Sequence, residues 1–126
     1  MRRQITTDRA PSAVGPYAQG VVAGGLLFTA MQIALAPGSG EMIGTSAPEQ
    51  ARQCLENIRA IVEAAGASMA NVVKTIVYLS DIGQFGAVNE VYGEFFTDAL
   101  PARGVVETSA LPKGALVAVE AIAHVE

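Results

Sequence analysis

The sequence has one histidine, His124, and one cysteine, Cys54, in 126 residues. Protein metal sites usually take three or four nitrogen or sulfur ligands, so we expect no metal site. The same scarcity argues against a Ser-His-Asp or Cys-His nucleophile system, in which His124 near the C-terminus would have to be the base. A single cysteine excludes an internal disulfide framework and favours a reducing, cytoplasmic location.

Positive charge is also scarce. Eight Lys and Arg residues face twelve Asp and Glu residues, and only Arg2 and Arg3 are adjacent, so a nucleic-acid partner is disfavoured. Glycine is abundant, with 13 residues, but no phosphate-binding pattern of the G-x-G-x-x-G or G-x-x-x-x-G-K-[ST] kind follows a predicted strand and opens a helix. We therefore expect no nucleotide cofactor, and no cofactor of another kind is indicated.

Residues 10–40 contain no charged side chain, which raises the question of a membrane span. A spanning helix needs roughly 20 apolar residues in one piece, and Gly15-Pro16, Gly24-Gly25 and Pro37 interrupt this stretch. Polar residues follow Met1 where a signal peptide needs an apolar segment, so we expect neither export nor a membrane partner. Because 51% of the residues are hydrophobic in a chain of one-domain size, we expect a homo-oligomer to bury apolar surface.

Turn and cap signals divide the first half of the chain. Gly24-Gly25, flanked by β-branched and aromatic residues, predicts a hairpin of two antiparallel strands within residues 21–30. Residues 37–40 predict a loop. A capping box from Ser46 to Glu49 starts a helix that ends at Gly66. Its apolar stripe consists of Ala51, Leu55, Ile58, Val62 and Ala65, with Cys54 as a small core residue beside it.

The second half predicts a central strand at residues 72–79, a helix capped by Asp81 and stopped by Pro101, and strands at 104–109 and 115–125. The face of this helix that we assign to the core consists of Phe85, Val88, Tyr92 and Phe95. Helices between strands of one sheet indicate a two-layer α+β fold with both helices on one face. We expect the other face, carrying side chains such as Val119 and Ala121, to lie against another subunit.

Arg103 is the most informative polar residue, because it stands between Pro101 and an apolar strand. A guanidinium forms a planar fork of donors that fits a carboxylate, so it indicates either a bound carboxylate ligand or a salt bridge to Glu120 or Glu107. Glu120 itself has a structural alternative, which is to satisfy donors within the core. Asn89 on the second helix and Tyr17 beside Gly15-Pro16 have structural alternatives too, as a backbone cap and as loop packing.

A series of motifs resembles the RidA/YjgF family over nearly the whole chain. In chain order they are Ala10-Pro11, Gly15-Pro16-Tyr17-Ala18-Gln19, Asn57, Val72-Val73-Lys74, Val88-Asn89, Tyr92, Phe95-Phe96, Pro101-Ala102-Arg103 and Leu111-Pro112-Lys113-Gly114-Ala115. The resemblance implies one domain at residues 1–126 with a chorismate-mutase-like fold, assembled as a homotrimer with ligand clefts between subunits. It also implies hydrolysis of reactive 2-imino or enamine acids to 2-keto acids and ammonia. Arg103 matches the residue that holds the substrate carboxylate, and Tyr17 and Asn89 match residues that line the cleft.

Four positions depart from the family's active pattern. Ala30 and Met31 replace the usual serine and glycine, and Val105 replaces a frequent cysteine. Ala118 stands where the family's deaminases carry the glutamate that orients water, and Glu120 matches the next acidic position, about 6.5 Å along a strand. The resemblance therefore implies a weak or altered deaminase whose site includes Met31, Val105 and Glu120. The alternative is a non-catalytic trimer that binds small carboxylates. A ribonuclease role, attributed to some relatives, is disfavoured by the negative charge.

Overall fold

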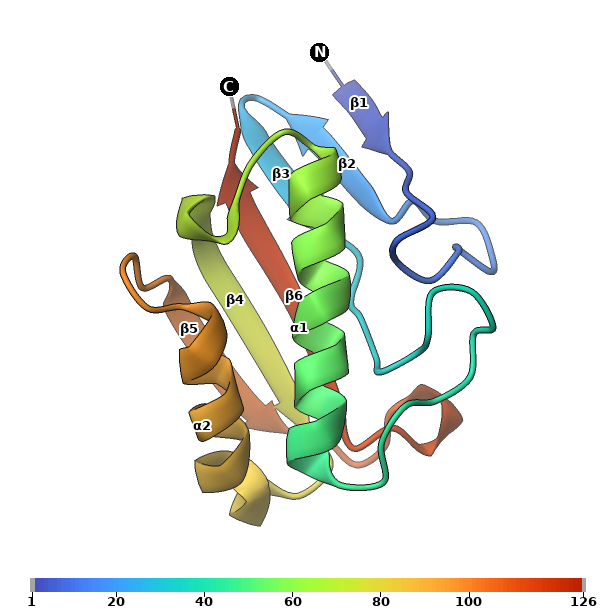
Figure 1. Ribbon diagram of the computed structural model, residues 1–126, viewed down its shortest axis with the longest axis vertical. Helices are drawn as coiled ribbons and strands as arrows, with labels where there is room; N and C mark the ends of the chain where they lie inside the picture. Colours follow the sequence, from blue (N-terminus) through green and yellow to red (C-terminus); the bar gives the residue numbers. More distant parts are fainter. Residues whose placement is uncertain (1, 126) are drawn as a thin grey trace.

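The computed structural model describes residues 2–125, which form a six-stranded sheet with two helices on one face (Figure 1). The strands are ordered β1-β2-β3-β6-β4-β5, and all neighbours are antiparallel except β4 and β5, which are parallel. The predicted two-layer α+β architecture is confirmed. In chain order the elements are β1 (Arg2–Ile5), β2 (Gly20–Ala23), β3 (Leu26–Thr29), α1 (Ala47–Ala64), β4 (Val72–Leu79), α2 (Phe85–Phe95), β5 (Ala102–Glu107) and β6 (Val117–His124).

The predicted hairpin is formed by β2 and β3. Gly24 and Gly25 connect the strands with φ angles of 60° and 78°, a region that glycine enters without steric cost. Strand β1 was not predicted, because three of its four residues are exposed and its sequence is mostly polar. It pairs with β2 at the edge of the sheet, where only Ile5 is buried.

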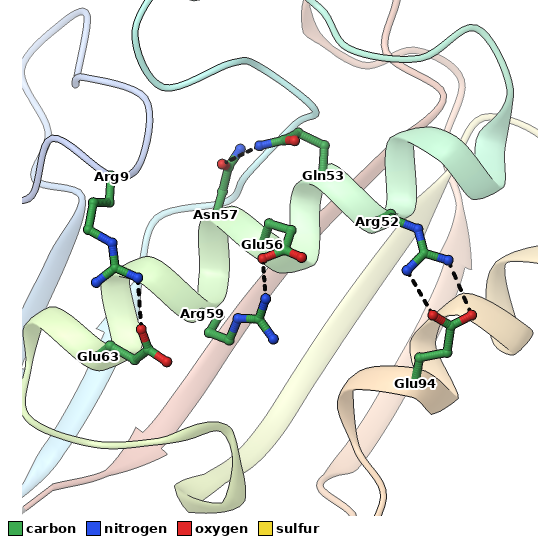
Figure 2. Close-up of polar contacts among 8 residues, drawn as sticks. All are labelled: Arg9, Arg52, Gln53, Glu56, Asn57, Arg59, Glu63 and Glu94. Carbon is green, nitrogen blue, oxygen red and sulfur yellow. Dashed lines mark hydrogen bonds and ion pairs between the residues drawn. The ribbon is translucent and has the colours of Figure 1, made fainter.

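Helix α1 begins and ends as expected. Ser46 and Glu49 form the reciprocal capping box, and Gly66 follows the last turn with a φ of 88°. The predicted apolar stripe is buried, as is Cys54 beside it. The outer face carries ion pairs instead, from Arg52 to Glu94 of α2 and from Arg9 to Glu63, which lie in solvent along the helix (Figure 2).

Strand β4 is central, with β6 on one side and β5 on the other. Helix α2 differs from its prediction: it ends at Phe95, well before Pro101, and its buried residues are Val88, Val91 and Tyr92, whereas Phe95 is half-buried. Phe85 is 38% exposed, because it lies at the first turn of α2, after the short 3-10 turn that Asp81 caps. No helix within residues 2–125 is long and apolar enough to cross a membrane.

The two faces of β6 are the reverse of the prediction. Val119 and Ala121 are buried under the helices, whereas Glu120 and Ile122 lie on the face that no helix covers. We call this uncovered side the open face of the sheet. The prediction failed because β6 has small or apolar residues at both its odd and its even positions, so the alternation of polar and apolar residues does not show which side faces the helices.

Candidate functional site

Arg103 lies within β5, paired with Thr75 of the parallel strand β4, because β5 begins two residues earlier than predicted. Its guanidinium lies over α2, with Cζ 4.7 Å from the ring centroid of Tyr92 and 5.3 Å from that of Phe85. Its Nη1 donates a 2.6 Å hydrogen bond to Oδ1 of Asn89. Phe85, Asn89 and Tyr92 are spaced four and three residues apart, so they share one face of α2. We call these three residues the arginine cradle.

All three contacts of the cradle are uncharged. Among residues 2–125, the ion pairs join other arginines to Glu56, Glu63 and Glu94, and none of them involves Arg103. The two expected partners are occupied elsewhere. Glu120 accepts a 2.8 Å hydrogen bond from the Tyr78 hydroxyl, and Glu107 accepts one from the backbone N–H of Ile82. The salt-bridge alternative for Arg103 is therefore wrong, and its exposed positive charge has no ion-pair partner among the residues that the structure describes.

Tyr92 is the most constrained member of the cradle. It is only 7% exposed, and its hydroxyl is 2.7 Å from Oγ1 of the fully buried Thr75. Burial raises the pKa of the Tyr92 phenol, while the hydrogen bond with Thr75 and the charge of Arg103 act in the opposite direction. The phenol is therefore protonated at neutral pH, and its ring presents a neutral, electron-rich face to the guanidinium.

Tyr17 and Met31 lie together in a separate place. They line a cavity of about 570 Å³ whose walls are mostly apolar and whose one charged lining residue is Lys113. Gln32 and Ala30 also contribute to it. Arg103 and Asn89 are not among the residues that line this cavity. In one chain the predicted site is thus divided into two parts, the arginine cradle at the β5 edge and the cavity formed by loops next to β2 and β3.

The remaining predicted residues are distributed over both sides of the sheet. Val105 lies on the same face as Arg103 and packs against the core. Glu120 lies on the open face, where its hydrogen bond raises the pKa of the Tyr78 phenol. Ala118 pairs with Tyr78 across the strands and is fully buried within the chain. Within one chain, Glu120 and Ala118 are therefore not next to Arg103.

Sequence reasoning missed the roles of Phe85, Tyr92 and Thr75. The spacing of Phe85, Asn89 and Tyr92 was visible, but it was assigned to the core, since spacing alone does not reveal what a helix face contacts. Asn57 also matters for the site, because its Nδ2 donates to the carbonyls of Ile33 and Leu35 at 3.3 and 3.0 Å. It thereby holds the loop that lines the cavity against α1.

Comparison with known proteins gives consistent matches along the whole chain. Residues 7–125 match the family model described as Endoribonuclease L-PSP. A RutC family protein of Pyrococcus horikoshii is 48% identical over 126 residues, which is 100% of both chains. The human 2-iminobutanoate/2-iminopropanoate deaminase is 42% identical over 123 residues, covering 98% of this chain and 90% of its own.

Solved structures agree with these sequence matches. The YjgF gene product from Escherichia coli has a TM-score of 0.92 at 44% identity, covering 97% of this chain and 98% of its own. TdcF from the same organism, crystallised with bound serine, has a TM-score of 0.93 at 42% identity, covering 98% of this chain and 99% of its own. The fold and the order of its elements are therefore those of these proteins.

Proposed function

This chain belongs to the Endoribonuclease L-PSP family, to which the RidA/YjgF proteins belong, and from that premise we propose that it is an imine and enamine deaminase. The reaction would hydrolyse reactive 2-imino acids, and the enamines that tautomerise to them, to 2-keto acids and ammonia. The identity of 42% to the human 2-iminobutanoate/2-iminopropanoate deaminase supports this reaction class. The ribonuclease in the family description is not our proposal, because the net charge is −4 and the basic residues are dispersed.

The observation that carries the proposal is the neutral cradle of Arg103. A guanidinium has five N–H donors, of which Nη1 supplies one to Asn89, so other donors remain for a ligand. Because every contact of the cradle is neutral, an incoming carboxylate would be the first anion to pair with this charge. Arg103 would hold the substrate carboxylate in a bidentate pair. TdcF with bound serine supports a small carboxylate ligand in this family.

The two parts of the site lie at different ends of one sheet, so we propose that they meet between copies of the chain. A homotrimer would bring the cavity of one subunit, with Tyr17 and Met31, to the cradle of the next. The open face supports this assembly, since Phe28 and Val106 are 43% and 46% exposed there. Residues 1–126 would form one RidA/YjgF-like domain in each subunit. A cytoplasmic location, expected from the single cysteine, stays a prediction.

Deamination adds water to the carbon of the C=N bond and then expels ammonia from the resulting carbinolamine. Arg103 would act by fixing the substrate relative to that water, which converts a bimolecular encounter into a positioned reaction. Ala118 offers no group that could take a proton from the water, and Glu120 would act only from the open face of a subunit. We therefore propose a modest rate, with the water held by main-chain groups.

A second candidate is a non-catalytic trimer that binds small carboxylate metabolites. Ala118 favours it, because the side chain at this position has neither an acidic nor a hydrogen-bonding group. The two candidates share Arg103 and differ only in turnover. Saturable binding of a 2-keto acid without accelerated hydrolysis would identify the binding module.

The test couples the purified protein to a pyridoxal-phosphate dehydratase that generates 2-aminoacrylate from serine, and follows pyruvate release. We expect the wild type to accelerate release over buffer and Arg103→Ala to abolish most of the gain. Arg52→Ala is the matched control, because it removes an exposed arginine that pairs with Glu94 at the surface, away from Arg103. No acceleration by the wild type, or equal loss in both variants, would overturn the proposal.

A further inference from the structure

The ring of Tyr92 is held from three directions. Its hydroxyl is bound to Thr75, its neighbour Phe96 packs on it with ring centroids 4.6 Å apart, and the guanidinium of Arg103 lies over it at 4.7 Å. Phe96 is 4% exposed, so the ring has little room to turn. Phe85, the other aromatic contact of Arg103, is far more exposed and has no hydroxyl with which to fix its ring. The orientation of the guanidinium therefore depends on Tyr92 more than on Phe85.

The anchor of this ring stands directly beside Arg103. Thr75 of β4 and Arg103 of β5 are register partners in the parallel pair, so both side chains leave the sheet toward α2 at the same level. Three contacts thus form a closed set: Tyr92 of α2 is hydrogen-bonded to Thr75 of β4, Arg103 of β5 lies over the ring of Tyr92, and Arg103 is the register partner of Thr75. Any displacement of the ring that carried its hydroxyl away from Thr75 would have to break this buried bond, while Phe96, packed on the ring, restrains rotation about the long axis of the ring.

We propose that Tyr92 is a positioning residue for Arg103, and that its hydrogen bond to Thr75 fixes the direction in which the guanidinium meets a ligand carboxylate. The inference deepens the proposed function and rests on it for its effect on substrate. An arginine side chain carries considerable rotamer freedom, and restricting that freedom before binding lowers the ordering cost that the ligand must overcome. Tyr92 itself exchanges no proton with the substrate, because its hydroxyl is buried and engaged with Thr75.

The variants that test this inference remove the tether and keep the ring. Tyr92→Phe deletes only the hydroxyl, and Thr75→Val replaces its partner by a side chain of similar shape. Each single variant leaves a buried hydroxyl without its partner, whereas the double variant leaves none. We expect the double variant to recover part of the stability lost in the single variants. If the hydrogen bond between Tyr92 and Thr75 had a purely structural role, ligand binding and turnover in the double variant would recover together with its stability.

The first readout does not depend on activity. In protein labelled with ¹⁵N-arginine, relaxation of the Nε–H group reports how rigidly each arginine side chain is held, and Arg103→Lys identifies its signal by loss. We expect a rigid Nε–H in the wild type and a mobile one in both single variants and in the double variant. Tyr78→Phe is the matched control, since it removes a tyrosine hydroxyl from the opposite face of the sheet. Unchanged Arg103 dynamics without the tether would overturn the inference.

The second readout is the steady-state kinetics of imine hydrolysis. We expect KM to rise about 3- to 10-fold in Tyr92→Phe, the range that the loss of one net hydrogen bond produces, with little change in kcat. The double variant should show the same KM as the single variants, because all three lose the same tether. A KM that returns toward the wild-type value in the double variant, in parallel with stability, would contradict positioning. If the wild type shows no turnover, the deaminase proposal fails, while the relaxation experiment still decides the role of Tyr92.

Discussion

Arg103 and Glu120 point to opposite faces of the same sheet. Arg103 lies over the rings of α2 on the helix side, whereas Glu120 is bonded to Tyr78 on the open face. Glu120, which the sequence analysis named as a possible salt-bridge partner, therefore does not neutralise Arg103 of the same chain. This separation leaves one exposed positive charge among neutral partners, and it explains why a carboxylate ligand is the expected occupant.

Asn89→Asp tests the importance of a neutral cradle. The oxygen that accepts from Arg103 at 2.6 Å would then carry a charge, and the resulting ion pair would compete with a ligand carboxylate. We expect affinity for a 2-keto acid to fall about 10- to 100-fold, measured by isothermal titration calorimetry. Gln84→Glu, an equal change in net charge at an exposed position just before α2, should bind as the wild type does. Wild-type affinity in Asn89→Asp would exclude this role for the charge.

Ala118→Glu tests the proposal that position 118 is where the family resemblance expects a water-orienting glutamate. We expect the new carboxylate to raise kcat by at least about tenfold, since a positioned base typically contributes 10²- to 10⁴-fold when its geometry is favourable. Ala118 is fully buried and faces Tyr78 across the strands, so retention of the fold is checked by thermal unfolding. Ala118→Gln has nearly the same size without the ionisable group and should stay slow. Equal rates in the two variants would remove Ala118 from the water-binding position.

The buried thiol of Cys54 should lower the free energy of unfolding at alkaline pH. Burial raises the pKa of its thiol from 9.0 to about 12, so the unfolded chain loses a proton at a lower pH than the folded chain does. The contribution is fully present below pH 9 and is lost as pH rises toward 12, by up to about 1.4 kcal/mol per pH unit. Urea unfolding should show that the free energy of unfolding of the wild type, relative to that of Cys54→Ala, is lower at pH 10 than at pH 8. A constant difference between the two proteins would contradict the shift.

Asn57→Leu tests the link between α1 and the cavity loop. Asn57 is fully buried, and its loss would remove the hydrogen bonds that its Nδ2 donates to the carbonyls of Ile33 and Leu35. We expect a loss of about 1–3 kcal/mol in the free energy of unfolding, measured with urea, because the Leu35 carbonyl loses its donor while that of Ile33 keeps its bond from the Leu35 N–H. Gln53 donates to Asn57 from a half-exposed position on the helix (Figure 2), so Gln53→Ala should cost less than about 1 kcal/mol. Equal costs would show that the buried bonds to the loop contribute nothing.

The elements that the sequence specified locally were predicted well. Gly24-Gly25 required a tight turn, and the capping box at Ser46 and Glu49 required a helix start, because each signal acts within a few residues. Strand β1 was missed because its pairing with β2 comes from a partner about 20 residues away, and its polar side chains carry no strand pattern. The faces of β6 were reversed because Ala118, between Val117 and Val119, makes both parities similar.

The site could be predicted only residue by residue. Arg103, Asn89, Tyr17 and Met31 were identified from chemistry and from the family resemblance, and the structure brings Arg103 to Asn89 and Tyr17 to Met31. The aromatic part of the cradle was not predicted, since helical spacing shows which residues share a face and not what that face contacts. In the proposed trimer the pair Arg103 and Asn89 meets the pair Tyr17 and Met31 of another subunit. Hydrophobic periodicity and motifs within one chain carry no signal of that contact.

Binding of 2-oxobutanoate by isothermal titration calorimetry tests the central claim most directly, which is that Arg103 holds the carboxylate of a small acid. We expect saturable binding to the wild type and to Arg52→Ala, whose arginine pairs with Glu94 at the surface. Arg103→Ala should weaken the affinity at least about tenfold, as expected when a charge-assisted hydrogen bond is lost. Equal affinity in Arg103→Ala and the wild type would contradict the claim.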